Sequence, residues 1–275
     1  MTRRSRDGFY ALWTLAIFLS AFVALFAVLF VSCQAAPETA EEQTQLNTEP
    51  SGEPEAQAQE PMQEAPTEPT VSATLAQTDD YGPDYLSRFV FLGDGNTYML
   101  RSTGTVPKSQ VWSTSEGYLT LSDHASTYIL YHGDDGSEQE MLIYNAAGVR
   151  QPEYLLINLG YTGLNQTTEA EFKAAYTALI QTIQMASPGT KILCQSILPV
   201  MENSYAEVSN GRITTANQWI LEVAEQTETR YLNAAELLMD ETGGLRSEYA
   251  GSDGALLSQA GCEAVLYYVR THYYQ

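Results

Sequence analysis

Three polar, glycine-containing segments lie next to apolar runs that could be buried strands or helices. They are GDGNT (93–97), LGYTG (159–163) and SDGAL (252–256). In α/β proteins the carboxyl ends of parallel strands meet at one edge of the sheet, and ligands bind there. A buried strand that stops in a tight Gly-Asp turn is the geometry on which α/β enzymes mount a nucleophile, yet Gly95 has no side chain. The spacing therefore indicates a candidate active site that lacks its attacking atom.

Other side chains near these segments could take part in acyl chemistry. Ester hydrolysis needs an oxygen nucleophile, a base within hydrogen-bond reach and donors aimed at the developing oxyanion. Thr97 carries a hydroxyl, and Asp94 or Asp253 could activate water directly. Two of these side chains also have a structural interpretation: Thr97 caps a helix or faces the core, and Asp253 bonds loop backbone. The histidines available as bases are His124, His132 and His272.

The segments must be positioned by an alternation of strands and helices. Apolar, β-rich runs predict strands at 88–94, 153–160, 190–198 and 229–234, and amphipathic stretches predict helices at 168–186, 213–227 and 258–272. Continuous apolar runs are typical of strands buried on both faces of a parallel sheet. The fold class predicted is α/β, a three-layer α/β/α sandwich with a central parallel sheet. Alternating apolar and polar residues in 111–132 predict a small hairpin near the crevice.

The order and spacing of these segments resemble the SGNH/GDSL hydrolases over residues 85–272. Further segments are similar to those of membrane-tethered clostridial-type members: VW…GYLTL (111–121), QSILPV (195–200) and RTH (270–272). In this family a Ser follows Gly-Asp after the first strand, and a Gly comes from the next block. An Asn follows a Gly after a later strand, and a His closes an Asp-x-x-His motif near the C-terminus. The resemblance implies an SGNH-like sandwich with the flavodoxin-like strand order.

Mapped onto that pattern, three of the four name-giving positions carry other residues. Gly95 stands where the family has Ser, Thr162 where it has Asn, and Leu256 where it has His, whereas Gly117 keeps the glycine and Asp253 remains of the Asp-x-x-His motif. The backbone N–H groups of both glycines and the Thr162 hydroxyl could still form part of an oxyanion hole. Glycine cannot attack, however, and leucine cannot accept a proton. In a serine protease the loss of the nucleophile or the base costs on the order of 10⁶ in turnover.

The resemblance therefore implies a crevice without the inherited catalytic pair. The residues expected to line it are Asp94, Gly95, Asn96, Thr97, Gly117, Gly160, Tyr161, Thr162 and Asp253. Four tyrosines lie in or beside the crevice blocks, and their faces would suit a sugar ring; the alternative is that they belong to the core. They are Tyr98, Tyr118, Tyr161 and Tyr249.

The function expected is binding of a cell-envelope ligand, such as an acylated glycan, or of a protein partner, in a catalytically degenerate crevice. The alternative is an active esterase or deacetylase that acts on wall or exopolysaccharide acyl groups with non-standard residues, and a third is a structural domain with a vestigial crevice. A net charge of −21 argues against nucleic acid as a partner. The sequence shows no metal-ligand spacing, and no cofactor is expected. Cys194 and Cys262 are read as small core residues, with a disulfide between them as the alternative.

The N-terminal third predicts a membrane attachment and a tether. Residues 1–8 contain three arginines and 9–33 contain no charge, so the run exceeds the roughly 20 residues that a spanning helix needs. We expect a cytoplasmic basic tail (1–8), a transmembrane anchor (9–33) and an extracytoplasmic C-terminal part; a signal or lipoprotein segment ending at Cys33 is the alternative. Residues 34–80, with eleven acids and many prolines, predict a disordered acidic linker, and 81–275 the folded domain.

Overall fold

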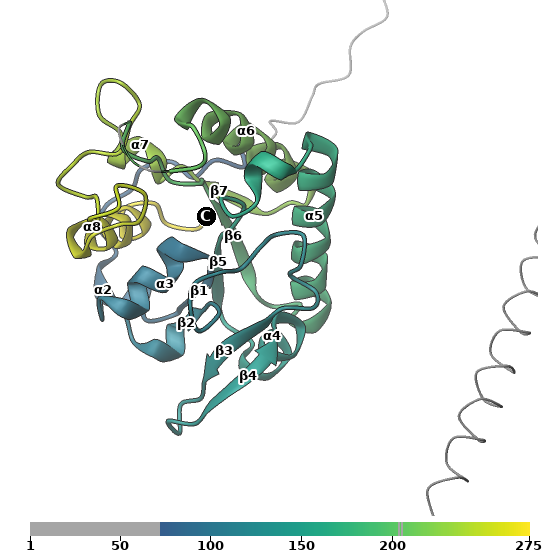
Figure 1. The fold of residues 1–275 in the computed structure, drawn as a ribbon. Helices are drawn as coiled ribbons and strands as arrows, with labels where there is room; N and C mark the ends of the chain where they lie inside the picture. Colours follow the sequence, from purple (N-terminus) through teal and green to yellow (C-terminus); the bar gives the residue numbers. More distant parts are fainter. Residues whose placement is uncertain (1–71, 203, 205) are drawn as a thin grey trace, which may run out of the picture. The chain divides into compact units, whose positions relative to one another are not determined.

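The computed structural model describes residues 72–202, 204 and 206–275. A five-stranded parallel sheet runs through this part of the chain (Figure 1). In spatial order its strands are β2 (Val111–Trp112), β1 (Phe89–Gly93), β5 (Tyr154–Asn158), β6 (Lys191–Gln195) and β7 (Arg230–Leu232). The order is the flavodoxin-like one, because the second strand lies on one side of the first and the later strands follow on the other. The crevice of such a sheet lies where the order reverses, outside the carboxyl ends of β1 and β5.

Helices cover both faces of the sheet, which confirms the three-layer sandwich (Figure 1). One face carries α4 (Ile143–Arg150), α5 (Glu169–Ala186) and α6 (Asn210–Gln226), and the other carries α2 (Gly82–Leu86), α3 (Gly95–Ser102), α7 (Ala235–Leu238) and α8 (Gln259–Arg270). The side chains of β1 alternate between the two cores: Val90 and Leu92 pack on the first face, Phe89 and Phe91 on the second. Burial on both sides explains why the strands read as continuous apolar runs.

The expected hairpin at 111–132 is wrong in position. Its first two residues form β2 at the edge of the main sheet, and the antiparallel hairpin consists of β3 (Tyr128–His132) and β4 (Glu138–Leu142). Residues 113–127 form an irregular loop between β2 and β3. The Leu130 amide donates to the Ser113 carbonyl at 2.8 Å, so β3 lies directly beyond the end of β2. A two-residue strand is too short to show a period, and the alternating residues Leu119, Thr120, Leu121 and Ser122 lie in the irregular loop.

The predicted helix limits follow from local capping. Thr168 caps α5 in a capping box, in which its hydroxyl accepts from the Glu171 amide and the Glu171 carboxylate accepts from the Thr168 amide. Serine hydroxyls at Ser209 and Ser258 cap the N-termini of α6 and α8. Two short 3₁₀ turns, η2 (Lys108–Gln110) and η3 (Leu164–Gln166), precede β2 and α5. The η3 turn brings the chain from β5 into α5 beside the crevice.

Residues 73–80, which the sequence assigns to the linker, pack on the domain. Leu75 donates its amide to the Tyr231 carbonyl in β7 at 2.9 Å, and the Tyr231 amide donates to the Ala73 carbonyl at 2.8 Å. Asp80 accepts a hydrogen bond from Arg270 Nε in α8 at 2.8 Å. The ordered domain therefore begins before residue 81, because this segment pairs with the outer edge of β7. The predicted tail (1–8), anchor (9–33) and most of the linker lie outside the described residues, and no helix within the described residues is long and apolar enough to cross a membrane.

The two cysteines of the described domain lie in different cores and are both free. Cys194 packs on the face covered by α5 and α6, where its Sγ lies 3.4 Å from Thr229 Oγ1, and Cys262 packs on the face covered by α8. Burial raises the pKa of Cys194 to about 12 and that of Cys262 to about 11. The sheet between them rules out the alternative disulfide and leaves both as small core residues, as expected.

Candidate functional site

The turn after β1 and the loop before α8 meet at Gly95. A Cβ built on Gly95 would lie 2.6 Å from Leu256 Cδ2, so the leucine side chain packs directly over this glycine. Gly117, in the 113–127 loop, lies against the same glycine, because a Cβ built on Gly117 would lie 3.4 Å from the Gly95 Cα. We call Gly95, Gly117 and Leu256 the Gly95 cluster. The structure thus brings together three positions that are far apart in the sequence. They are the positions at which the resemblance places the nucleophile, the base and an oxyanion donor.

Two of the crevice positions require glycine. Gly117 has a φ of +81°, and a Cβ there would meet Tyr98 Cβ at 3.0 Å. Gly160 has a φ of +113°, and a Cβ there would lie 2.6 Å from the Phe172 ring. A positive φ combined with so little space leaves no room for a side chain at either position.

Asp94 and Thr162 link the β1 turn to the β5 loop. The amide and the hydroxyl of Thr162 both donate to Asp94 Oδ2, each at 3.3 Å. Asp94 is 3% exposed, and this burial raises its pKa to about 7, although the hydrogen bonds from Thr162 act in the opposite direction. The Thr162 hydroxyl is therefore turned toward Asp94 and is not free to serve as the oxyanion donor that the sequence allowed. The Gly117 amide is engaged as well, because it donates to the Thr114 carbonyl at 3.4 Å.

Asp253 and Asn96 hold the loop that carries Leu256. The exposed Asp253 accepts from the amides of Ala255 and Leu256, both at 2.9 Å. Asn96 accepts from the Leu257 amide at 2.9 Å and thereby fixes this loop to the start of α3. Of the two roles considered for Asp253, these contacts support the structural one. They also explain why the leucine stays in place over Gly95.

Thr97 does not face the crevice. It is 2% exposed and lies under β1, so that a Cβ built on Gly93 would collide with its hydroxyl oxygen. A buried hydroxyl that faces the core cannot reach a substrate, which argues against Thr97 as a substitute nucleophile. Its burial agrees with the structural interpretation, in which it faces the core.

Each histidine of the described domain is engaged with its own surroundings. His124 Nδ1 lies 2.7 Å from the Leu121 carbonyl, and His132 Nε2 lies 2.9 Å from Glu138 Oε2. His272 is buried and stacks on Tyr268 with 3.7 Å between ring centroids. Within the described residues, no hydrogen bond joins a histidine to the Gly95 cluster, and no group of three or more His, Cys, Asp and Glu residues could hold a metal ion. The arrangement therefore presents no replacement for the Ser-His pair.

Of the four tyrosines considered, one presents an open aromatic face. Tyr118 is 75% exposed and follows Gly117, so it stands at the rim of the crevice. Tyr98 lies beside the Arg101 guanidinium at 5.1 Å, and Tyr249 packs against the core beneath α8. Tyr161 is half-buried, and burial raises its pKa. Tyr98, Tyr161 and Tyr249 thus contribute largely to packing.

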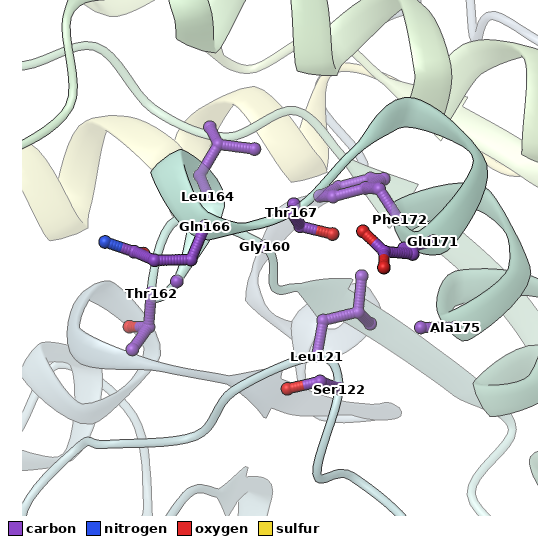
Figure 2. A pocket seen from close by; sticks show the side chains of 11 residues that line it. Leu121, Ser122, Gly160, Thr162, Leu164, Gln166, Thr167, Glu171, Phe172 and Ala175 are labelled. Carbon is purple, nitrogen blue, oxygen red and sulfur yellow. The ribbon is translucent and has the colours of Figure 1, made fainter.

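A pocket of about 310 Å³ adjoins the cluster on the β5 side (Figure 2). We call it the α5 pocket; it lies between Leu121 and Ser122 of the loop, residues 160–167 after β5, and the first two turns of α5. Of the crevice residues predicted from the sequence, Gly160 and Thr162 line it. The other residues that line the pocket were not predicted from the sequence, because Phe172 has the pattern of a core residue and Ser122 that of a loop residue. The one available signal was their position after β5, where open α/β sheets bind ligands.

This sheet order, with the β1 turn, the Gly117 loop and the loop before α8 meeting at one edge, is the fold of the SGNH/GDSL hydrolases. Among solved structures, a protein of Streptococcus pneumonia described under the name platelet activating factor is similar, with 24% identity over 66% of this chain and 82% of the other and a TM-score of 0.51. A GDSL-like lipase from Bacteroides thetaiotaomicron matches 68% of this chain and 87% of its own with 15% identity and a TM-score of 0.48. No protein-family model and no curated protein sequence matches the chain. The likeness to the Streptococcus structure is one of fold, and it agrees with the fold that the resemblance to the SGNH/GDSL hydrolases implies.

Proposed function

We propose that this chain is a membrane-anchored, extracytoplasmic protein that binds a cell-envelope ligand in the crevice of an SGNH/GDSL-hydrolase fold without hydrolysing esters. One observation carries the proposal: the Leu256 side chain packs on Gly95, at the two positions where the family has its base and its nucleophile. An apolar side chain thus fills the space in which the reacting groups would meet.

The chemistry of acyl transfer supports the loss of activity. The Gly95 position offers a backbone amide and no attacking atom, and Leu256 cannot take a proton from water or from a hydroxyl. In a serine protease that lacks its catalytic residues, about 10³–10⁴ of rate enhancement over water remains from binding and the oxyanion hole. Here two of the three expected oxyanion donors, the Thr162 hydroxyl and the Gly117 amide, are engaged within the protein. The residual rate enhancement should therefore be small as well.

The second candidate function is ester hydrolysis with Asp94 as a general base acting on water. The observation that favours it is the pKa of Asp94, which burial raises to about 7, near the value at which a general base works best at neutral pH. Against it, the carboxylate is buried and both hydrogen bonds from Thr162 fall on Oδ2. A carboxylate in that position orders the loop and has little access to water.

The nature of the ligand follows from charge and position. The apolar run at 9–33 and the acidic linker favour a location outside the membrane, at the cell envelope. A net charge of −21 disfavours polyanionic ligands and anionic lipid. The exposed ring of Tyr118 at the rim suits the apolar face of a sugar. We therefore place a glycan of the envelope ahead of a protein partner.

The test uses the full-length chain in detergent with 4-nitrophenyl acetate and a fluorophosphonate probe. We expect no turnover above the rate of a detergent blank and no labelled residue. Turnover that Asp94→Asn or Asp253→Asn abolishes, while the exposed control Asp84→Asn retains it, would show an active hydrolase and end the proposal. Turnover that all three variants retain would also end it, because the activity would then come from another residue of the domain.

A further inference from the structure

We infer that the ligand of this protein sits in the α5 pocket and that it is an uncharged sugar ring; the inference rests on the proposed function and adds the place and the class of the ligand. The pocket adjoins the inherited site at Thr162 but is separate from the Gly95 position, which Leu256 covers. Its volume of about 310 Å³ falls at the lower end of the range of roughly 300–1,000 Å³ for small-molecule sites. This is room for one ring rather than for an extended chain.

The walls of the pocket combine an apolar floor with a polar rim (Figure 2). Leu121 from the loop and Phe172 from α5 supply apolar surface, and Leu164 from η3 also lines the pocket. Ser122 and Gln166 carry polar groups at the rim, and the side-chain amide of Gln166 makes no hydrogen bond within the described residues. A pyranose has an apolar face of C–H groups and hydroxyls around its edge, so it matches both parts of this surface.

The charges of the pocket select against anions. Among the described residues that line it there is no Lys, Arg or His, and the one ionisable side chain is that of Glu171. The Glu171 carboxylate accepts from the Thr168 amide at 2.9 Å and from the Thr168 hydroxyl at 2.7 Å, so the helix cap holds it as an anion at the pocket wall. A ligand carboxylate or phosphate would meet a like charge there, and the adjacent Arg212 guanidinium is already engaged, because it donates to the Leu164 and Thr167 carbonyls at 3.2 and 2.7 Å. The pocket therefore fits a neutral sugar better than a uronic acid or a sugar phosphate.

The matched helix positions Ala174 and Ala175 allow a direct test. Ala175 lines the pocket, whereas Ala174, one residue earlier in α5, is exposed and outside it. Binding of glucose, N-acetylglucosamine and glucuronate to the full-length chain in detergent is titrated by ligand-observed NMR. We expect both neutral sugars to bind at least about tenfold more tightly than glucuronate, because one hydrogen-bonded or like-charged contact is worth roughly this factor. Ala175→Trp should abolish this binding and Ala174→Trp should leave it unchanged, with thermal unfolding of both variants followed as a check of the fold.

A milder variant keeps the test decisive if Ala175→Trp fails to fold. Gln166→Ala removes only the unpaired rim amide and should weaken binding of the neutral sugars by roughly 3- to 10-fold, the usual worth of one hydrogen bond. Three results would overturn the inference: no binding of either neutral sugar, equal binding of glucuronate, or binding that Gln166→Ala and Ala175→Trp leave intact but Tyr118→Ala removes. None of these results depends on ester turnover, which is measured on the same sample and decides the proposed function separately.

Discussion

Replacement of Asp94 by asparagine should remove a pH-dependent loss of stability from the wild-type protein. Burial raises the pKa of Asp94 from its ordinary value of 3.8 to about 7 in the folded state. Between these two values the unfolded chain has released the proton while the folded chain still holds it. The contribution of Asp94 to stability is therefore complete below about pH 4 and is lost as the pH rises through 7. The asparagine side chain of the Asp94→Asn variant stays uncharged throughout and can still accept from Thr162.

The size of the effect follows from the pKa difference. The span from 3.8 to about 7 is roughly three pH units, and each unit corresponds to about 1.36 kcal/mol, so the wild type should lose about 4 kcal/mol relative to Asp94→Asn. Other carboxylates, such as that of Asp80, whose pKa Arg270 lowers, act in the opposite direction at low pH. Because they are shared by both proteins, they cancel in the difference between the two unfolding free energies.

The measurement is urea unfolding of both full-length proteins at about pH 4, 5, 6, 7 and 8, followed by the fluorescence of the buried Trp112 and Trp219. The unfolding free energy of Asp94→Asn minus that of the wild type should increase with pH up to about pH 7 and stay constant above it. Thr162→Val removes one hydrogen bond to the charged carboxylate and should therefore raise the pKa of Asp94 further. In this variant the pH-dependent loss of stability should continue to a higher pH than in the wild type. A difference between wild type and Asp94→Asn that stays constant over this whole range would refute the reasoning, since it would mean that water solvates this carboxylate.

Two further predictions concern the glycines of the crevice. Gly95→Ala should destabilise the domain by about 1 kcal/mol, because its Cβ would lie 2.6 Å from Leu256 Cδ2. In a Leu256→Ala background this cost should disappear. Strictly additive effects of the two substitutions in urea unfolding would mean that the two residues do not touch. Gly160→Ala should lower the stability of the domain by roughly 2–4 kcal/mol, because Gly160 has a φ of +113° and its Cβ would lie 2.6 Å from the Phe172 ring. The control Gly189→Ala, whose Cβ would have nothing within 4 Å, should change the melting temperature little. Equal melting temperatures of the two variants would contradict this.

The sequence predicts the buried framework well because burial leaves a local record. The runs around β1 and β5 are apolar at nearly every position since both faces of the sheet are covered, and α5 begins and ends at recognisable capping and stop residues. β2 escapes prediction because it has only two residues. Residues 73–80 escape it because their order depends on an open edge at β7, a feature of the folded sheet rather than of the segment itself.

The site could be predicted only in part, because its contacts are non-local. The meeting of Gly95, Gly117 and Leu256 was foreseen through the family resemblance, and no periodicity or composition contains it. Nothing local tells whether the Thr162 hydroxyl points toward a ligand or toward Asp94, which lies 68 positions earlier in the chain. The α5 pocket was missed for the same reason, since Phe172 has the spacing of a core residue and is one, while it also borders the pocket.

The central claim is that ester hydrolysis was lost through three side chains on an otherwise intact scaffold. Fluorophosphonate labelling of the wild type and of the triple variant Gly95→Ser, Thr162→Asn, Leu256→His, read out by mass spectrometry, tests it most directly. The wild type should remain unlabelled, and the folded triple variant should be labelled at position 95, where removal of the leucine makes room for the new hydroxyl. A labelled wild-type chain, or a folded triple variant that stays unlabelled, would contradict the claim.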